Sequence, residues 1–227
     1  MKMKRMHILL MLLSAATFAL AQDSGSNKMR FALLGGVNLQ TLNGKDFNGD
    51  KFDNDLITGF HIGVNAQIPI VPDFYFQPGL LFTTKGAKST DGDITSTFKL
   101  SYIELPLNLV YKGSLGNGFI MLGFGPYVAY GISGKAIYED GSTSEKIEMD
   151  VVFKNVVEIN DPVLSPYFKA FDAGGNIFVS YEMAAGIFMQ LNTQFGMFKI
   201  NPIDDRIPGG KMSIKNTGFG LSLGYRF

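Results

Sequence analysis

The feature that most constrains this chain is a strict alternation of bulky apolar residues with small or polar residues, repeated along most of its length. Near the C-terminus, Phe219, Leu221 and Leu223 alternate with Gly220 and Ser222. Successive side chains of a β-strand point to opposite faces of the sheet, so a period of two predicts strands with one apolar face.

The same alternation recurs in eight segments, at about 29–39, 57–68, 74–83, 98–111, 120–132, 171–182, 187–197 and 216–227. Strands of about ten residues match a tilted crossing of a bilayer. The stretch 113–134 is uncharged and long enough for a membrane helix, but its glycines and Pro126 disfavour a helix and its period of two indicates a strand.

The face opposite the apolar one carries mostly Gly, Asn, Gln, Ser and Thr, and charged residues make up only 18% of the chain. A soluble sandwich or a lipocalin-like barrel also alternates, but it turns its apolar face inward and covers its outside with Lys and Glu. The sequence therefore predicts an all-β, eight-stranded antiparallel transmembrane β-barrel, an up-and-down meander with a polar lumen.

The connections between the predicted strands alternate in length. Short ones lie at 69–73, 113–118 and 183–186, and long polar ones lie at about 40–56, 84–97, 133–169 and 199–214. Outer-membrane barrels have short periplasmic turns and longer extracellular loops. We therefore expect the long loops outside the cell and both termini in the periplasm.

The N-terminus indicates export. Lys2, Lys4 and Arg5 precede an apolar run that ends in Ala19-Leu20-Ala21, so residues 1–21 are predicted to be a cleaved signal peptide and 22–227 the barrel. The formal net charge is +0 and Cys is absent from the sequence, so a general nucleic-acid binder and a thiolate metal site are both disfavoured.

Five ionisable residues fall on the predicted lumen face, and they are Arg30, Glu104, Asp172, Glu182 and Arg226. An eight-stranded barrel is just wide enough for side chains to fill, and charges confined there must pair. We expect a polar network that plugs the lumen, with Glu182 or Glu104 as the counter-charge of the two arginines. A narrow pore is the alternative.

The candidates for catalysis and metal binding are sparse. His61 is the only histidine of the predicted mature chain, and G-x-S-x-G, HExxH and P-loop patterns are absent from the sequence. A barrel-borne lipid-modifying enzyme would need His61 beside a Ser and an acidic or amide partner. We expect His61 to be a hydrogen-bonded lumen residue, with no enzymatic activity and no cofactor.

Four loop carboxylates are expected to be solvated rather than metal-bound: Asp91, Asp93, Asp204 and Asp205.

Four motifs together resemble the outer-membrane β-barrel family of porin-family or PorT-like proteins. They are Tyr102-Ile103-Glu104-Leu105-Pro106-Leu107, Gly123-Phe124-Gly125-Pro126-Tyr127 leading to Gly134-Lys135, Phe171-Asp172-Ala173-Gly174, and the ending Gly220-Leu221-Ser222-Leu223-Gly224-Tyr225-Arg226-Phe227. The resemblance covers nearly all of 28–227 and implies location and fold but no agreed ligand. The interval 133–169 matches poorly. Tyr225 and Phe227 are similar to the C-terminal signal read by the barrel-assembly machinery.

Two classes of function follow from these observations. The first is a structural or interaction barrel with a plugged lumen, and the alternative is a narrow porin-like channel for small solutes. A PorT-like component of a secretion apparatus and a lipid-modifying enzyme are more distant. The expected partners are outer-membrane lipid and lipopolysaccharide, the barrel-assembly machinery during insertion, and an envelope or extracellular partner that the sequence does not identify; nucleic acid is not expected.

Overall fold

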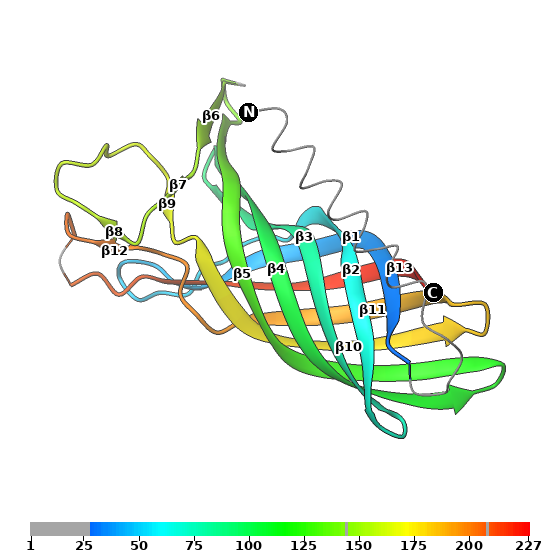
Figure 1. The fold of residues 1–227 in the computed structure, drawn as a ribbon. Helices are drawn as coiled ribbons and strands as arrows, with labels where there is room; N and C mark the ends of the chain where they lie inside the picture. Colours follow the sequence, from blue (N-terminus) through cyan, green and yellow to red (C-terminus); the bar gives the residue numbers. More distant parts are fainter. Residues whose placement is uncertain (1–27, 144, 208) are drawn as a thin grey trace, which may run out of the picture.

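The protein is a closed ring of antiparallel strands in a computed structural model that describes residues 28–143, 145–207 and 209–227. Each strand of the ring pairs with the next ring strand along the chain, and pairing of the first ring strand with the last closes the ring (Figure 1). This confirms the predicted eight-stranded antiparallel meander. The expected signal peptide, residues 1–21, lies outside the described residues.

The ring strands are β1 (Arg30–Lys45), β2 (Ile57–Val71), β3 (Phe74–Asp91), β4 (Ile94–Leu115), β5 (Gly118–Asp140), β10 (Phe171–Met183), β11 (Ile187–Gly196) and β13 (Ser213–Arg226). Two pairings span long insertions in the sequence. β5 pairs with β10, for example Phe124 with Ile177, and β11 pairs with β13, for example Leu191 with Leu221. β1 meets β13 along its length, from Ala32↔Arg226 to Lys45↔Ser213.

The barrel is apolar outside and polar inside. Phe219 and Leu221 are 56% and 40% exposed, whereas Asn38 and Ser222 are 3% and 1% exposed. A soluble protein would expose the second pair and bury the first, so the soluble alternatives are wrong. The outward aromatic residues include the ring pairs Phe74–Tyr111 and Tyr225–Phe227 at the end where the turns lie.

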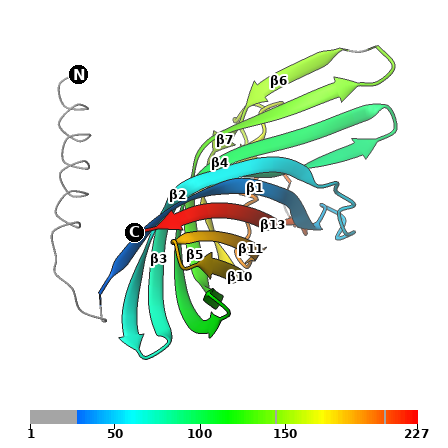
Figure 2. The ribbon, with the colours of Figure 1, turned by 90° about the vertical axis from the view of Figure 1, so that its right-hand side faces the viewer.

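Tight turns join the strands at one end. Gly116 adopts a positive φ of 61° between β4 and β5, and Gly186 adopts 86° between β10 and β11. Asp73, between β2 and β3, has a φ of 65°. In Figures 1 and 2, these turns lie at the end of the barrel where the described chain begins and ends.

One predicted loop is instead a hairpin. Residues 84–97 were expected to be a long loop, but β3 and β4 remain paired from Lys85↔Leu100 to Asp91↔Ile94 and turn at Gly92. The outer face of this hairpin is rich in Thr, with Thr84, Thr90, Thr95 and Thr97. Because a strand beyond the bilayer no longer needs an apolar outer face, the alternation of hydrophobicity ends before the backbone pairing ends.

The other long connections also contain paired segments. β6 (Lys146–Asp150) continues the sheet beside β5, which itself extends to Asp140 into the expected 133–169 loop. β7 (Val152–Phe153) pairs with β9 (Tyr167–Phe168), and β8 (Val156–Val157) pairs with β12 (Ile203–Asp204), both in parallel. These pieces gather at the end opposite the turns, the loop end (Figure 1).

Among the residues that the structure describes, none belongs to a helix with the length and hydrophobicity to cross a membrane.

The close approach of β1 and β13 gives a test of ring closure. A Cβ at Gly36 would lie 1.9 Å from the Leu221 carbonyl oxygen, whereas one at the adjacent Gly35 would find its nearest atom, the His61 oxygen, at 3.5 Å. Gly36→Ala is expected to lower the free energy of unfolding by about 1–3 kcal/mol, the usual cost of overpacking. Gly35→Ala is the matched control and should stay near the parent in urea titrations of the reconstituted barrel. Equal midpoints for the two variants would contradict this close approach.

Candidate functional site

The lumen holds two separate groups of charged side chains. The turn-end cluster consists of Arg30, Lys112, Glu182 and Arg226, and the central cluster consists of Lys85, Glu104 and Asp172. The structure therefore divides the five sequence-predicted lumen residues between two places. It adds two lysines that the sequence analysis did not identify.

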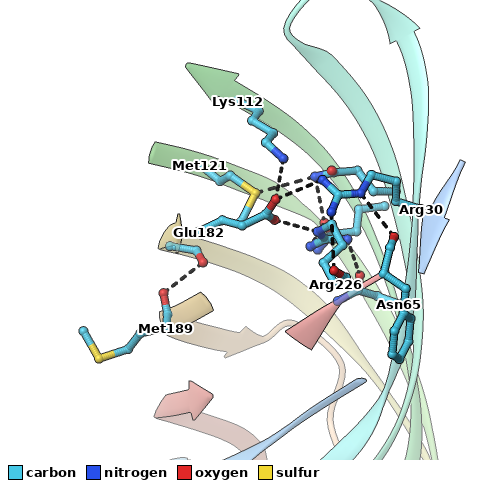
Figure 3. Close-up of polar contacts among 11 residues, drawn as sticks. Arg30, Asn65, Lys112, Met121, Glu182, Met189 and Arg226 are labelled. Atoms are coloured by element: carbon cyan, nitrogen blue, oxygen red, sulfur yellow. Dashed lines mark hydrogen bonds and ion pairs between the residues drawn. The ribbon is translucent and has the colours of Figure 1, made fainter. Parts of the chain in front are cut away.

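Glu182 lies at the centre of the turn-end cluster. Its carboxylate accepts hydrogen bonds from Arg226 Nε at 2.7 Å, Lys112 Nζ at 2.7 Å and Arg30 Nη1 at 3.2 Å (Figure 3). Arg226 also donates to Asn65 Oδ1 at 3.1 Å and to Gln77 Oε1 at 3.3 Å. One carboxylate thus binds three cations, and Arg30 also donates to the backbone oxygens of Arg226 and Phe227 at 3.3 Å and 3.2 Å.

The strands bring these residues together through the closure of the ring. Arg30 opens β1 and Arg226 ends β13, and these strands are neighbours. Glu182, near the end of β10, and Lys112, near the end of β4, face them across the lumen. Arg226 and Glu182 are each 1% exposed, so their charges depend on each other rather than on bulk water.

The central cluster has the opposite balance, with one cation between two carboxylates. Lys85 Nζ lies 2.8 Å from Glu104 Oε2 and 3.1 Å from Asp172 Oδ2. Two neighbouring side chains add hydrogen bonds to the carboxylates: Gln194 donates to Glu104 at 2.6 Å, and Asn216 donates to Asp172 Oδ2 at 2.9 Å, while Asp172 Oδ1 is buried without a partner among the described residues. The Lys85 ammonium also lies 4.2 Å from the centre of the Tyr127 ring, within the range of a cation–π contact.

Glu104 is not the counter-charge of Arg30 and Arg226. The strand pattern left Glu182 and Glu104 as possible counter-charges of the arginines, and in the structure Glu182 pairs with them while Glu104 pairs with Lys85. Lys85 was overlooked because it lies in the segment expected to be a loop, and Lys112 because it lies one residue past the expected end of its strand. Lys85 lies two residues after Thr83, and Lys112 lies an even number of residues after Glu104. If the period of two had been continued in each strand, both lysines would have been predicted on the lumen face.

His61 lies in the lumen between a serine and an amide. Its Nδ1 is 2.7 Å from Asn38 Oδ1 and its Nε2 is 2.7 Å from Ser222 Oγ. A barrel-borne lipid-modifying enzyme would need these partners for His61, a serine and an amide. However, the cavity beside these residues measures about 40 Å³, and Ser222 is 1% exposed. Such a space suits about one water molecule, not a lipid ester.

The two C-terminal aromatic residues face outward. Tyr225 and Phe227 are 46% and 58% exposed, and their rings pack edge to face at 5.3 Å. The Phe227 amide donates to the Phe31 carbonyl at 2.9 Å, which fixes the last residue to the first strand. Recognition of these residues by the barrel-assembly machinery stays a prediction.

The closed ring, the apolar exterior and the charged interior define a transmembrane β-barrel. A family model described as "outer membrane protein beta-barrel domain" matches residues 20–201. The chain therefore belongs to this family of outer-membrane proteins. The porin or PorT-like subdivision expected from the motifs is narrower than this match.

Solved structures resemble the chain weakly. Ail, the attachment invasion locus protein of Yersinia pestis, solved in complex with the heparin analogue sucrose octasulfate, is 13% identical; the match covers 88% of this chain and 99% of that chain with a TM-score of 0.44. Neisserial surface protein A is 14% identical; the match covers 86% of this chain and 95% of that chain with a TM-score of 0.40. No curated protein sequence matches the chain.

The turn-end cluster gives a test based on stability. Glu182→Gln leaves the buried Arg226 and Lys112 without their counter-charge, so the free energy of unfolding is expected to fall by about 3–5 kcal/mol, the scale for breaking a buried ion pair. The matched control is Glu148→Gln, because Glu148 pairs with Lys135 on the exposed surface of the β5–β6 hairpin. Urea unfolding of both variants in the same lipid should show a large decrease in the free energy of unfolding only for Glu182→Gln. An unchanged midpoint for Glu182→Gln would mean that water already solvates these cations.

Proposed function

We propose that this protein is a structural or interaction barrel of the outer membrane, with a lumen plugged by side chains and with no catalytic role. The observation that carries the proposal is the pair of charge clusters across the lumen. Lys85, Glu104 and Asp172 are each 1% exposed or less, and the cavity that borders Glu104 measures about 40 Å³. A pathway for solutes would need a continuous wet passage at this level.

The conductance of the purified protein tests this proposal directly. In planar lipid bilayers, the unmodified barrel is expected to insert without producing unitary current steps, whereas a known porin reconstituted in the same way should produce them. The insertion itself can be checked by the heat-modifiable mobility of protein recovered from the same vesicles. Reproducible, ion-selective steps from the folded barrel would favour the narrow channel and overturn the plug.

The proposed orientation places the loop end outside the cell and both termini in the periplasm. The contrast between the ends supports it, because tight turns such as Gly116-Asn117 lie at one end and the extended β3–β4 and β5–β6 hairpins at the other (Figure 2). In this orientation the loop end would meet lipopolysaccharide and any extracellular partner, and the turns would meet periplasmic partners.

Epitope tags can test the orientation. A tag inserted after Gly141, in the β5–β6 hairpin, is expected to bind antibody on intact cells. A tag inserted after Asn117, in the β4–β5 turn, should bind only after the outer membrane is permeabilised. Both tagged proteins should first show the heat-modifiable mobility of a folded barrel. Labelling of the Asn117 tag on intact cells would contradict the orientation.

A further inference from the structure

The loop end contains a cavity that neither the plug nor the anchoring in the membrane explains. It has a volume of about 920 Å³ and lies among the β1–β2 connection, the β3–β4 hairpin, β9 and the segment around β12. Ligand sites for small molecules commonly measure about 300–1,000 Å³. A space of this size is therefore large enough to bind a small organic molecule.

Buried side chains close the inner end of the cavity. Ala87 and Ile214 line it, and both belong to a buried apolar cluster that includes Tyr102 and Tyr127. Two residues further along the same inward face of β3 lies Lys85, whose ion pairs form the central cluster. The charged plug thus closes the floor, so a molecule that enters from the loop end would be retained and would not pass through the barrel.

The walls are largely aromatic and aliphatic. Phe98 packs against Phe168 at 5.5 Å and against Tyr138 at 6.3 Å between ring centres, and all three line the cavity. Other apolar lining residues are open to solvent, with Phe47 at 43% and Ile203 at 61% exposure. A ligand that covered this exposed apolar surface would be stabilised by about 25 cal/mol of binding free energy per Å² buried.

The charges around the cavity favour an anion. Lys88, Lys169 and Lys199 line it, and within the described ranges none of them forms an ion pair with another residue. The backbone brings two of them close, because the Lys169 amide donates to the carbonyl of Ile200, the neighbour of Lys199, at 2.6 Å.

The acidic residues of the lining do not cancel these lysines. Arg206 donates to Asp204 at 2.8 Å and 2.7 Å, and these hydrogen bonds hold the pKa of the Asp204 carboxyl below its usual value. Asp204 therefore stays ionised and engaged with Arg206. In the described lining, this leaves Asp205 as the one carboxylate without Arg206 as its partner, against three lysines.

We propose that this cavity binds an anionic amphiphile, with its apolar body between the aromatic walls and its single carboxylate or sulfonate at Lys169 and Lys199. The cavity is lined by loop-end segments and not by the outward apolar face of the strands, so the proposed ligand is a free molecule that enters from the loop end. An acyl chain of a membrane lipid has related chemistry, and the experiment distinguishes that source. This inference goes beyond the proposed function and rests on its plugged lumen only for the closed floor of the cavity.

Dodecanoate, below its micellar concentration, is a suitable probe for the protein in lipid nanodiscs. The chain contains no Trp, so Phe47→Trp introduces a single reporter at an exposed position of the lining. Saturable change of its emission with one binding site is expected. The cationic dodecyltrimethylammonium, with the same chain length, should bind at least about tenfold more weakly. Phe124→Trp, on the lipid-facing surface, reports dodecanoate that merely enters the bilayer.

Replacement of the lysines tests the anionic site. The double variant Lys169→Gln with Lys199→Gln is expected to weaken dodecanoate binding by about tenfold or more, which corresponds to about 1.4 kcal/mol. The matched control is Lys45→Gln, because Lys45 is exposed at the loop end outside the lining and should bind like the parent. If Phe47→Trp does not fold, equilibrium dialysis of radiolabelled dodecanoate against the unmodified barrel and the lysine variants gives the same comparison.

Three results would overturn the proposal. The first is equal binding of the anionic and cationic probes, and the second is a double variant that binds dodecanoate as tightly as the parent. The third is quenching of Phe47→Trp by brominated phospholipid in nanodiscs without added dodecanoate, which would identify a membrane lipid as the occupant. Quenching of Phe124→Trp alone by that lipid is the expected result.

Discussion

The structure depends on one constraint, which is that the interior of a bilayer offers no hydrogen-bond partners to a polypeptide backbone. Each strand must therefore pair on both sides, and a sheet satisfies this only if it closes. The pairing of β1 with β13, from Ala32 to Lys45, removes the last two edges. Gly36 permits this contact because its place against the Leu221 carbonyl leaves no space for a Cβ.

Closure in an apolar solvent reverses the usual distribution of side chains. The outer face contacts lipid, so polar and charged residues that hold the interior together lie in a narrow lumen. Charges there need partners because an isolated buried ion is costly. Glu182 meets this need for three cations, and Glu104 with Asp172 meets it for Lys85. In the proposed plugged barrel, the ion pairs that stabilise the fold would also fill the space through which a solute would have to pass.

Beyond the bilayer the constraint is relaxed, and the chain changes character. The hairpins of β3–β4 and β5–β6 keep their backbone pairing while their outer faces become polar, and the remaining loop segments fold over the barrel end around an apolar cavity. Lys85 of the central cluster lies two residues along the inward face of β3 from Ala87, which lines the cavity. The same buried charges therefore belong to the membrane-spanning barrel and close the inner end of the proposed ligand site.

The sequence by itself determined the fold class, the approximate positions of the eight strands and the face of the residues within the predicted spans, because a period of two assigns successive side chains to opposite sides of a strand. It also placed Arg30, Glu182 and Arg226 on the lumen face and offered Glu182 as one of two counter-charges of the arginines. It did not indicate that β3 and β4 continue past the apolar alternation, since hydrophobicity follows the bilayer and hydrogen bonding does not. Only the tertiary structure decided that Glu104 pairs with Lys85, that His61 lies between Asn38 and Ser222, and that the loops enclose a cavity. These contacts join strands far apart in sequence, and their partners are set by the register and closure of the ring, which a pattern within one strand does not encode.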